Sequence, residues 1–289
     1  MKLQDRSILI TGASQGLGKA IALACVEEGA SVFLCARNGD MLKQTQKEIS
    51  LRAKKSQQVL AKSADVSKPE EVHKLVEEVL RQLPNLNGLV NNAGVYGPIG
   101  LTENVDWEDW KKTIEINLFG IMLLSQAVIP VFREHSFGKI VNISGGGATS
   151  ALPRFSAYAA SKAAVVRFTE TLAEEVKAMG IHINAISPGP LNTRLLDEVL
   201  TAGPEKVGQA FYERSLKQKK EGGVPLEKGA ALCVFLLSRE SDGITGRLIS
   251  SVWDAWEMLP GHRTELENSD IYTLRRIVPE DRGIDLGSK

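Results

Sequence analysis

The chain has 289 residues, 43% of them hydrophobic, and its 35 basic and 35 acidic side chains cancel to a formal net charge of zero. This hydrophobic content supports a large core and excludes a chain that is disordered throughout, while the balanced charge argues against nucleic-acid and anionic-membrane partners. Three scattered cysteines and an opening segment without an apolar run predict a cytoplasmic protein with reduced thiols, and four histidines far apart in the sequence predict no metal site.

The first predicted elements are a strand, a glycine-rich turn and a helix. An apolar run at Ser7–Ile10 meets the turn Thr11–Gly18, and a periodic helix follows from Lys19 to Glu28. This order is typical of a dinucleotide-binding fingerprint, whose glycines permit a tight turn, close approach to a pyrophosphate and close packing of helix on strand. The amides and dipole of the helix N-terminus would bind the phosphates. The residues that we expect at the cofactor are Gly12, Ser14, Gln15, Gly16, Leu17 and Gly18.

The second predicted strand, Ser31–Cys35, bears on the identity of the cofactor. Chains that bind NAD usually end this strand with an acidic residue, which accepts a hydrogen bond from the ribose 2′-hydroxyl. Here Ala36 holds that place and Arg37 follows it. Because no carboxylate repels a 2′-phosphate and the guanidinium can pair with it, the sequence favours NADP(H), with NAD(H) as the alternative. Two observations argue against NADP(H). The glycine loop has Gln15 where a second basic residue could stand, and Arg37 could be a solvated surface charge.

The next two predicted strands complete the expected crevice. An amphipathic helix over Asp40–Arg52 precedes a third strand at Gln58–Ala64, and a fourth strand covers Leu86–Val90. Small-residue turns after strands one and four flank the point where strand order reverses in doubly wound sheets, which is where ligands bind. An aspartate at the end of the third strand could accept a hydrogen bond from an adenine amino group. The cofactor residues expected here are Asp65, Val66, Asn91, Ala93 and Gly94.

A long apolar stretch in the middle of the chain predicts a buried helix. The run Leu118–Phe132 has 15 residues and includes Gly120, Ser125 and Gln126, which makes it too short to span a bilayer, so we expect no membrane partner. Asn117 lies directly before this run. It is either a satisfied polar group in the core or a site residue that holds water.

Tyr158 and Lys162 are the candidate catalytic pair. They lie four residues apart in Ser156–Val166, where small and helix-favouring residues predict a helix, so their side chains share one face. A phenol normally titrates near 10, and an ammonium group one turn away would lower the tyrosine pKa towards a range useful for proton transfer. The alternative is a chance pair on an ordinary helix.

The alternation of strands and helices predicts an α/β fold, a Rossmann-like doubly wound parallel sheet in a single domain. We expect this catalytic domain to cover residues 1–253 and a C-terminal extension to cover 254–289. A polar, Lys-rich insertion at 194–223 follows a sheet-end loop, so it would overhang the crevice and shape substrate entry. The other expected elements are strands at Lys139–Ser144, His182–Ile186 and Gly246–Trp253 and a helix at Gly229–Leu237.

Together these motifs closely resemble those of the short-chain dehydrogenase/reductase family over residues 3–253. They occur in the family's order: Thr11-Gly12-xxx-Gly16-x-Gly18, Asn91-Asn92-Ala93-Gly94, Asn117, Tyr158-xxx-Lys162 and Pro188-Gly189-xxx-Thr193. The resemblance implies that Tyr158 is the general acid/base, that Lys162 binds the nicotinamide ribose and lowers the tyrosine pKa, and that Asn117 holds a relay water. It also implies that Asn91 and Gly94 line a ribose. The residues implied at the nicotinamide carboxamide are Pro188, Gly189, Leu191 and Thr193.

The resemblance further implies an NAD(P)-dependent oxidoreductase that interconverts a secondary alcohol and a ketone by hydride transfer. Its partner would be a small-molecule alcohol or ketone, and the chain would form a homodimer or homotetramer. Two alternatives remain. One is a sugar-nucleotide epimerase or dehydratase, although those relatives have a larger C-terminal lobe. The other is a dinucleotide-binding or regulatory protein with weakened catalysis.

Two departures from the family pattern bear on this expectation. The family usually has a serine thirteen positions before the tyrosine, where this chain has Gly145, with Ser144 one residue earlier. A shift in the flexible Gly145–Gly147 run would bring Ser144 into place as the catalytic serine; otherwise the role passes to Thr149 or Ser150, or is lost. The second departure is the end of the chain, which could form a subunit contact or pack on its own domain, and whose Arg275 and Arg276 could bind an anionic group.

Overall fold

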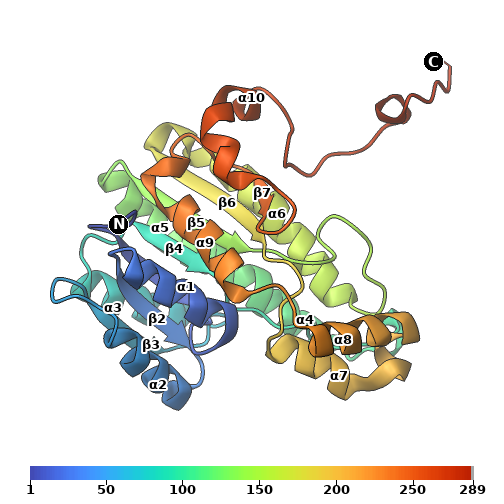
Figure 1. The fold of residues 1–289 in the computed structure, drawn as a ribbon, viewed down its shortest axis with the longest axis horizontal. Coiled ribbons are helices and arrows are strands. Elements are labelled where there is room, and N and C mark those ends of the chain that lie inside the picture. Colours follow the sequence, from blue (N-terminus) through green and yellow to red (C-terminus); the bar gives the residue numbers. More distant parts are fainter. Residues whose placement is uncertain (288–289) are drawn as a thin grey trace.

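The fold is built on one parallel sheet of seven strands in the order β3-β2-β1-β4-β5-β6-β7. A computed structural model describes residues 1–287 (Figure 1). This sheet, with helices on both faces, confirms the predicted single-domain, doubly wound α/β fold. The strands are β1 (Ser7–Thr11), β2 (Ser31–Ala36), β3 (Val59–Ser63), β4 (Gly88–Asn91), β5 (Gly138–Ile143), β6 (Ile181–Ser187) and β7 (Leu248–Ser250).

Alternate residues of the strands face two separate cores. In β1, Ile8 and Ile10 pack into one core and Leu9 into the other, because successive side chains of a strand point to opposite faces. The first core is covered by α1 (Gly16–Glu27), α2 (Gly39–Ser50) and α9 (Leu226–Leu237). The second is covered by α3 (Pro69–Gln82), α5 (Gly120–Glu134) and α6 (Ser156–Val176).

The centre of the sheet is the topological switch point. Strand β1 pairs in parallel with β2 on one side and with β4 on the other, and Ile10 lies between Leu34 and Val90. The turns that follow β1 and β4 therefore leave the sheet side by side at its carboxyl edge. This is the crevice position expected for a ligand of such a fold.

The helix before β5 is longer than its apolar run. Helix α4 (Trp107–Ile114), a π-helical turn η2 (Glu115–Phe119) and α5 form one continuous stretch. By length and composition alone this stretch, Trp107–Glu134, could cross a membrane, a test that the core helix of a soluble protein also passes. Here Leu124, Val128 and Phe132 pack into the second core.

Between β6 and α9 the chain forms a pair of helices beside the sheet. They are α7 (Arg194–Val207) and α8 (Gln209–Glu221), at the lower right of Figure 1. Gly208 separates them with φ 88°, a conformation that side-chain-bearing residues rarely adopt. Val199 and Val207 of α7 pack with Phe155 and Tyr158 in a small core of their own. This contact joins the helix pair to the start of α6.

The chain after β7 returns to its own domain before it leaves. Leu259 and Leu266 are buried in the first core, and the Leu248 amide donates to the Tyr272 carbonyl over 2.8 Å. Towards its C-terminal end the described chain extends away from the body (Figure 1). The remaining helical segments are η1 (Thr102–Asn104), η3 (Lys177–Met179), η4 (Arg239–Ser241), η5 (Trp256–His262), α10 (Arg263–Glu267) and η6 (Pro279–Arg282).

Candidate active site

The glycine loop is pressed against the turn that follows β4. Gly12 has φ 62°, and a Cβ there would lie 2.9 Å from the Ala93 Cα. A Cβ on Gly18 would lie 2.3 Å from the Gly12 carbonyl oxygen, so Gly18 serves close packing and does not line the cleft. Helix α1 begins at Gly16 without a side-chain cap, which leaves its first amides available. This cradle fits the pyrophosphate of a dinucleotide.

The turn after β4 is held by Thr11 and Asn92. Thr11 Oγ1 accepts hydrogen bonds from the Asn92 and Ala93 amides at 3.0 and 3.1 Å, and Asn92 Nδ2 donates to the Thr11 carbonyl at 2.9 Å. Asn92, Ala93 and Gly94 line the cleft. Asn91, expected at a ribose, lies elsewhere: it is the last residue of β4, is buried, and donates to Asn142 Oδ1 at 2.8 Å.

The end of the cleft at which we expect the adenine lies beyond β2 and β3. Arg37 and Asn38 line it on one side, and Asp65 and Val66 on the other. Within residues 1–287 the Arg37 guanidinium has no ion pair. Partial burial opposes ionisation of Asp65, but hydrogen bonds from the Ser67 hydroxyl and amide outweigh it and lower the pKa of Asp65. Asp65 is therefore an ionised acceptor at neutral pH.

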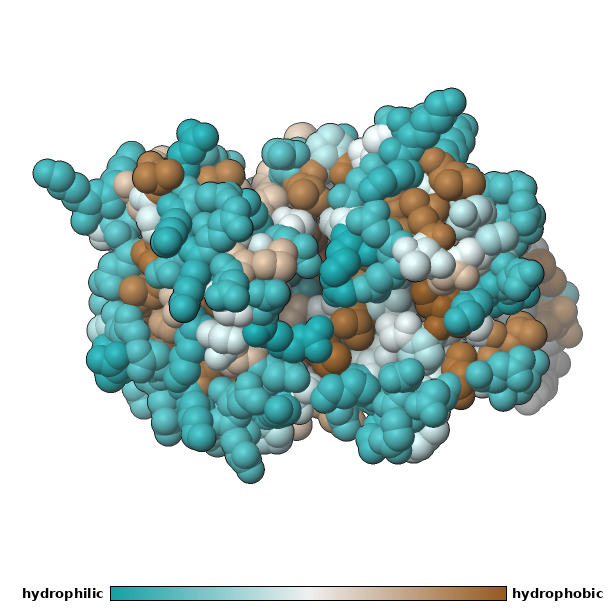
Figure 2. All heavy atoms as spheres, turned by 90° about the horizontal axis from the view of Figure 1, so that it is seen from below, coloured by the Kyte–Doolittle hydropathy of each residue, from teal (hydrophilic) through white to brown (hydrophobic). Residues whose placement is uncertain are grey.

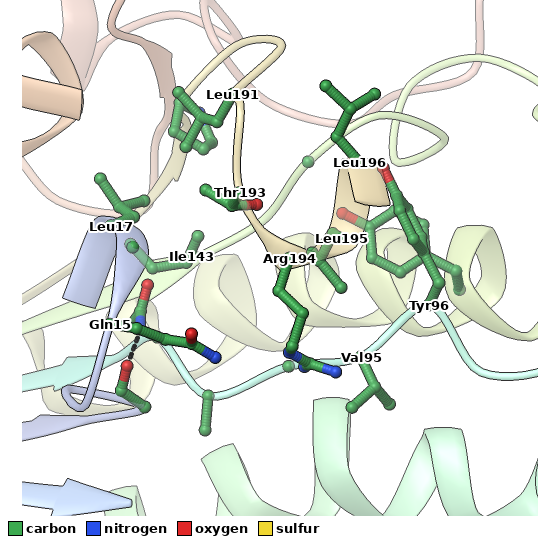
Figure 3. A pocket seen from close by; sticks show the side chains of 18 of the residues that line it. Gln15, Leu17, Val95, Tyr96, Ile143, Leu191, Thr193, Arg194, Leu195 and Leu196 are labelled. Carbon is green, nitrogen blue, oxygen red and sulfur yellow. Dashed lines mark hydrogen bonds between the residues drawn. The ribbon is translucent and has the colours of Figure 1, made fainter. Parts of the chain in front are cut away.

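One continuous cleft of about 1430 Å³ joins these regions. Figure 2 shows its mouth as a hollow between two lobes of the surface, with hydrophobic side chains gathered on the right-hand lobe. In Figure 3, Gln15 and Arg194 extend into the space between the glycine loop and α7. The expected cofactor residues that line the cleft are Gly12, Ser14, Gln15, Gly16, Leu17, Arg37, Asp65, Val66, Ala93, Gly94, Lys162, Pro188, Gly189, Leu191 and Thr193.

The loop after β6 closes over the glycine loop. A Cβ on Gly16 would lie 3.4 Å from the Thr193 methyl group, so the start of α7 lies directly over the start of α1. Gly189 has φ 82°, and a Cβ there would lie 2.7 Å from a Val252 methyl group. The end of the cleft at which we expect the phosphates therefore has the glycine loop on one side and the loop after β6 on the other.

Tyr158 and Lys162 lie together on the buried face of α6, and both line the cleft. Lys162 Nζ lies 5.6 Å from the centre of the Tyr158 ring and donates to the Ile143 carbonyl at 2.7 Å. Burial lowers the pKa of Lys162 to about 8, because the charged form loses its hydration.

The expected lowering of the tyrosine pKa is wrong for this structure. Burial disfavours the phenolate and raises the pKa of Tyr158 above the usual value of a phenol, and Tyr96 adds to the shift. Lys162 does not offset this effect, because its ammonium group is directed to the Ile143 carbonyl. Tyr158 is therefore a protonated donor at neutral pH, the form required to protonate an oxygen.

Asn117 is fully buried in the π-helical turn η2 and has all of its side-chain partners. Its Oδ1 accepts from the Val95 amide at 2.9 Å, and its Nδ2 donates to the Val95 carbonyl at 2.9 Å and to Ser161 Oγ at 3.0 Å. Ser161 Oγ donates in turn to the Tyr158 carbonyl at 2.7 Å. Asn117 thus ties the loop after β4 to the turn of α6 that carries Tyr158.

Ser144 and Gly145 lie next to the pair. Ser144 is buried and its hydroxyl donates to the Lys162 carbonyl at 3.3 Å, not to Tyr158. A Cβ on Gly145 would lie 2.4 Å from the Tyr158 hydroxyl oxygen, so the phenol occupies the space of a side chain there. Thr149 and Ser150 are exposed and do not line the cleft.

The wall beyond Tyr158 contains residues that no sequence motif identifies. Tyr96 follows the turn after β4, Leu152 precedes α6, and α7 and α8 add further side chains. These residues are far apart in the sequence and show no regular spacing. The only sequence feature that pointed to this wall is the polar insertion at 194–223. The additional lining residues are Tyr96, Leu152, Leu196, Val199, Phe211, Arg214, Ser215, Gln218 and Trp253.

Comparisons with known proteins agree with this geometry. The chain is 32% identical over 256 residues to the 3-oxoacyl-[acyl-carrier-protein] reductase FabG of Thermotoga maritima, covering 86% of this chain and 97% of that protein. Its fold matches NAD⁺-bound xylitol dehydrogenase, with TM-score 0.78, 26% identity, and coverage of 86% and 98%. It also matches a variant actinorhodin polyketide ketoreductase with NADPH, with TM-score 0.78, 29% identity, and coverage of 86% and 97%.

The family assignment follows from a match over most of the chain. Residues 6–202 match the model of the short chain dehydrogenase family, and this range contains the glycine loop, Asn117 and the Tyr158–Lys162 pair. The chain therefore belongs to the short-chain dehydrogenase family, and it is an oxidoreductase that acts on CH–OH or C=O groups.

Proposed function

We propose that the protein is an NADP(H)-dependent reductase that interconverts a ketone and a secondary alcohol, with Tyr158 as proton donor. The observation that carries the proposal is a buried, protonated phenol in the wall of a cleft that also holds a glycine loop at a helix N-terminus. Phosphate cradle and proton donor share one cavity, which is the arrangement that cofactor-dependent reduction requires.

The residues present fit a nicotinamide dinucleotide. The α1 N-terminus would hold the pyrophosphate, the Asp65 side would hold the adenine, and Lys162 would hold the nicotinamide ribose. When bound, the cofactor supplies or accepts the hydride. The loop Pro188–Thr193 would orient the nicotinamide ring, because it forms the cleft wall opposite the turn after β4.

The chain's own contribution is proton transfer and its positioning. Tyr158 would donate its proton to the carbonyl oxygen during reduction and recover it from solvent through Lys162, which is close to half protonated near pH 8. Asn117 and Ser161 position the backbone of Tyr158. Ser144 would contribute indirectly, because its hydroxyl donates to the Lys162 carbonyl and so helps to position this turn of α6.

The preference for NADP(H) rests on Arg37. Strand β2 ends at Ala36 without a carboxylate, and the exposed Arg37 guanidinium lines the adenine end of the cleft. A 2′-phosphate would find a charge partner there, whereas a 2′-hydroxyl would find no acidic acceptor on β2.

A catalytically weakened dinucleotide-binding protein is the second candidate, and Gly145 favours it. No side-chain hydroxyl stands at that position, and the Ser144 hydroxyl is directed to α6. An epimerase or dehydratase of sugar nucleotides is less well supported, because in the part of the chain that the structure describes no second lobe follows β7.

We also infer a cytoplasmic homodimer or homotetramer. All three cysteines are buried and reduced. The helical stretch α4–α5 exposes Trp107, Phe119 and Met122, which supports self-association through that face. Sedimentation of the purified chain measures the assembly directly.

A screen of ketones with NADPH and NADH tests the proposed function. We expect nicotinamide oxidation by the wild-type protein with at least one ketone, and turnover reduced by roughly a hundredfold or more in Y158F. Oxidation by Y158F at the wild-type rate would remove Tyr158 from the reaction. Tight dinucleotide binding without turnover on any ketone would favour the second candidate.

A further inference from the structure

A row of four aromatic rings leads from Tyr158 to α8; Tyr158, Tyr96 and Phe211 line the cleft, and the fully buried Phe155 packs behind them. The Tyr96 and Tyr158 ring centres are 4.7 Å apart, Tyr96 and Phe155 are 5.2 Å apart, and Phe155 and Phe211 are 5.0 Å apart. Leu152 and Val199 pack in the same cluster. A substrate whose carbonyl oxygen met the Tyr158 hydroxyl would therefore extend along a largely apolar wall towards α8.

Helix α8 presents one face to the cleft. Phe211, Arg214, Ser215 and Gln218 all line it, and their spacing of three, four and seven residues places them on one side of a helix. The Arg214 guanidinium lies 5.7 Å from the centre of the Phe211 ring. The aromatic row therefore ends at a cation.

Arg214 has no carboxylate partner among the described residues, unlike Arg194 and Lys219 of the same helix pair. Lys219 pairs with Asp197 at 2.6 Å, and Arg194 pairs with Glu198. No ion pair of Arg214 is present among the residues from 1 to 287. A guanidinium without a partner at the wall of a cleft is suited to a ligand carboxylate or phosphate, which it binds with two parallel hydrogen bonds.

The polarity of the wall narrows the substrate class. Between Tyr158 and Arg214 the wall is formed mainly by Tyr96, Leu152, Val199 and Phe211, whereas the polar Ser215 and Gln218 lie beside Arg214 on α8. We propose that Arg214 binds an anionic group of the substrate, and that the substrate is a ketone with an apolar, ring-sized body and a carboxylate or phosphate at its far end. This inference rests on the proposed function, because the orientation of the substrate in the cleft follows from the placement of its carbonyl oxygen at Tyr158.

Matched ligands that cannot react test the inference by binding alone. The NADP⁺-loaded protein is titrated calorimetrically with phenylalkanoates of increasing chain length and with the corresponding amides. Phenylalkyl phosphates form a second anionic arm, which decides between carboxylate and phosphate. We expect at least one acid or phosphate to bind roughly tenfold tighter than its amide, because the amide keeps the shape and loses the charge.

Two variants assign the difference to Arg214. R214Q should abolish the preference for the anion and leave NADP⁺ affinity unchanged. The matched control K217Q removes a cation from the same helix that does not line the cleft, and it should keep the preference.

Equal binding of acid and amide across the series, or an anion preference that survives in R214Q, would overturn the inference. Failure of the proposed function is distinguishable from this outcome. In that case the anions still bind through Arg214, but no ketone oxidises NADPH.

Discussion

At the scale of single residues, Gly145 shows how closely the proton donor is fitted. The Tyr158 hydroxyl fills the space that a Cβ at Gly145 would need, whereas a Cβ on the next residue, Gly146, would meet no atom within 4 Å. Position 145 therefore lacks both a hydroxyl group and the space for a side chain. A side chain at position 145 has to displace the phenol.

We predict that G145A lowers turnover while G146A does not. The added methyl group of G145A moves the Tyr158 hydroxyl and supplies no hydrogen bond in return, so kcat should fall roughly tenfold or more with little change in NADPH affinity. Steady-state kinetics and cofactor titration of both variants check this. Equal activity of G145A and G146A would show that the phenol is not held there.

Lys162 provides a test that depends on pH. Its pKa is about 8 in the folded protein and 10.5 when unperturbed. Between these values the unfolded chain binds more protons, so the free energy of unfolding rises with pH in this window. Relative to K162M, the wild type should gain about 2–3 kcal/mol of stability from pH 8 to pH 10.5.

Urea denaturation of both proteins across this range measures the difference. K162M lacks the titrating group, so all other titrations cancel in the comparison. A constant difference between the two proteins would mean that Lys162 is not desolvated.

At the scale of elements, the sequence predicts strands well and their last residues poorly. Buried parallel strands are continuous apolar runs, so all seven could be located. The predicted fourth strand ends at Val90, but β4 continues through Asn91. Successive side chains of a strand point to opposite faces, so an error of one residue changes the face that a side chain is expected to occupy. Asn91 therefore bonds within the sheet, and Asn92 holds the turn at the cleft.

The start of α7 yields a prediction on cofactor affinity. Thr193 lies over Gly16, and Arg194 extends into the cleft beside the expected pyrophosphate site. R194M should weaken NADPH and NADH equally, by roughly tenfold, because both carry the pyrophosphate. R37A should weaken NADPH alone.

Fluorescence titration of both cofactors with both variants separates the two arginines. An equal loss of NADPH and NADH affinity in R37A would contradict the proposed 2′-phosphate contact. Unchanged affinities in R194M would leave the pyrophosphate to the helix N-terminus alone.

At the scale of the whole molecule, the chain between β7 and Tyr272 packs on the domain. The Arg247 guanidinium donates to the Ile271 and Ser269 carbonyls at 2.7 and 3.0 Å and to the Leu266 carbonyl. These bonds fix residues 266–271 against β7, which is otherwise an edge strand of the sheet. The tail thereby covers part of an exposed sheet edge.

We expect R247Q to lower the free energy of unfolding by about 2–4 kcal/mol, because three carbonyls lose a charged donor. Chemical denaturation measures this, with the exposed R276Q as control. If R247Q were as stable as R276Q, the tail would not contribute to the fold.

The substrate wall shows where prediction from sequence ends. The glycine loop, Asn117 and the Tyr158–Lys162 pair have fixed spacings, because one local element holds each of them. Tyr96 and Phe211 are brought together by the packing of α7 and α8 on the start of α6. Such tertiary contacts leave no periodic signal, so neither the aromatic row nor the role of Arg214 could be derived from the sequence.

Transfer of a deuterium label from the cofactor to the product tests hydride transfer at Tyr158. NADPH carrying deuterium on its transferable position is incubated with a ketone substrate and either wild-type protein or Y158F, and the alcohol is analysed by mass spectrometry. We expect deuterium on the carbinol carbon of the alcohol formed by the wild type, and product formation by Y158F at about 1% or less of the wild-type rate with unchanged NADPH affinity. Alcohol without deuterium, or product formed equally fast by Y158F, would contradict it.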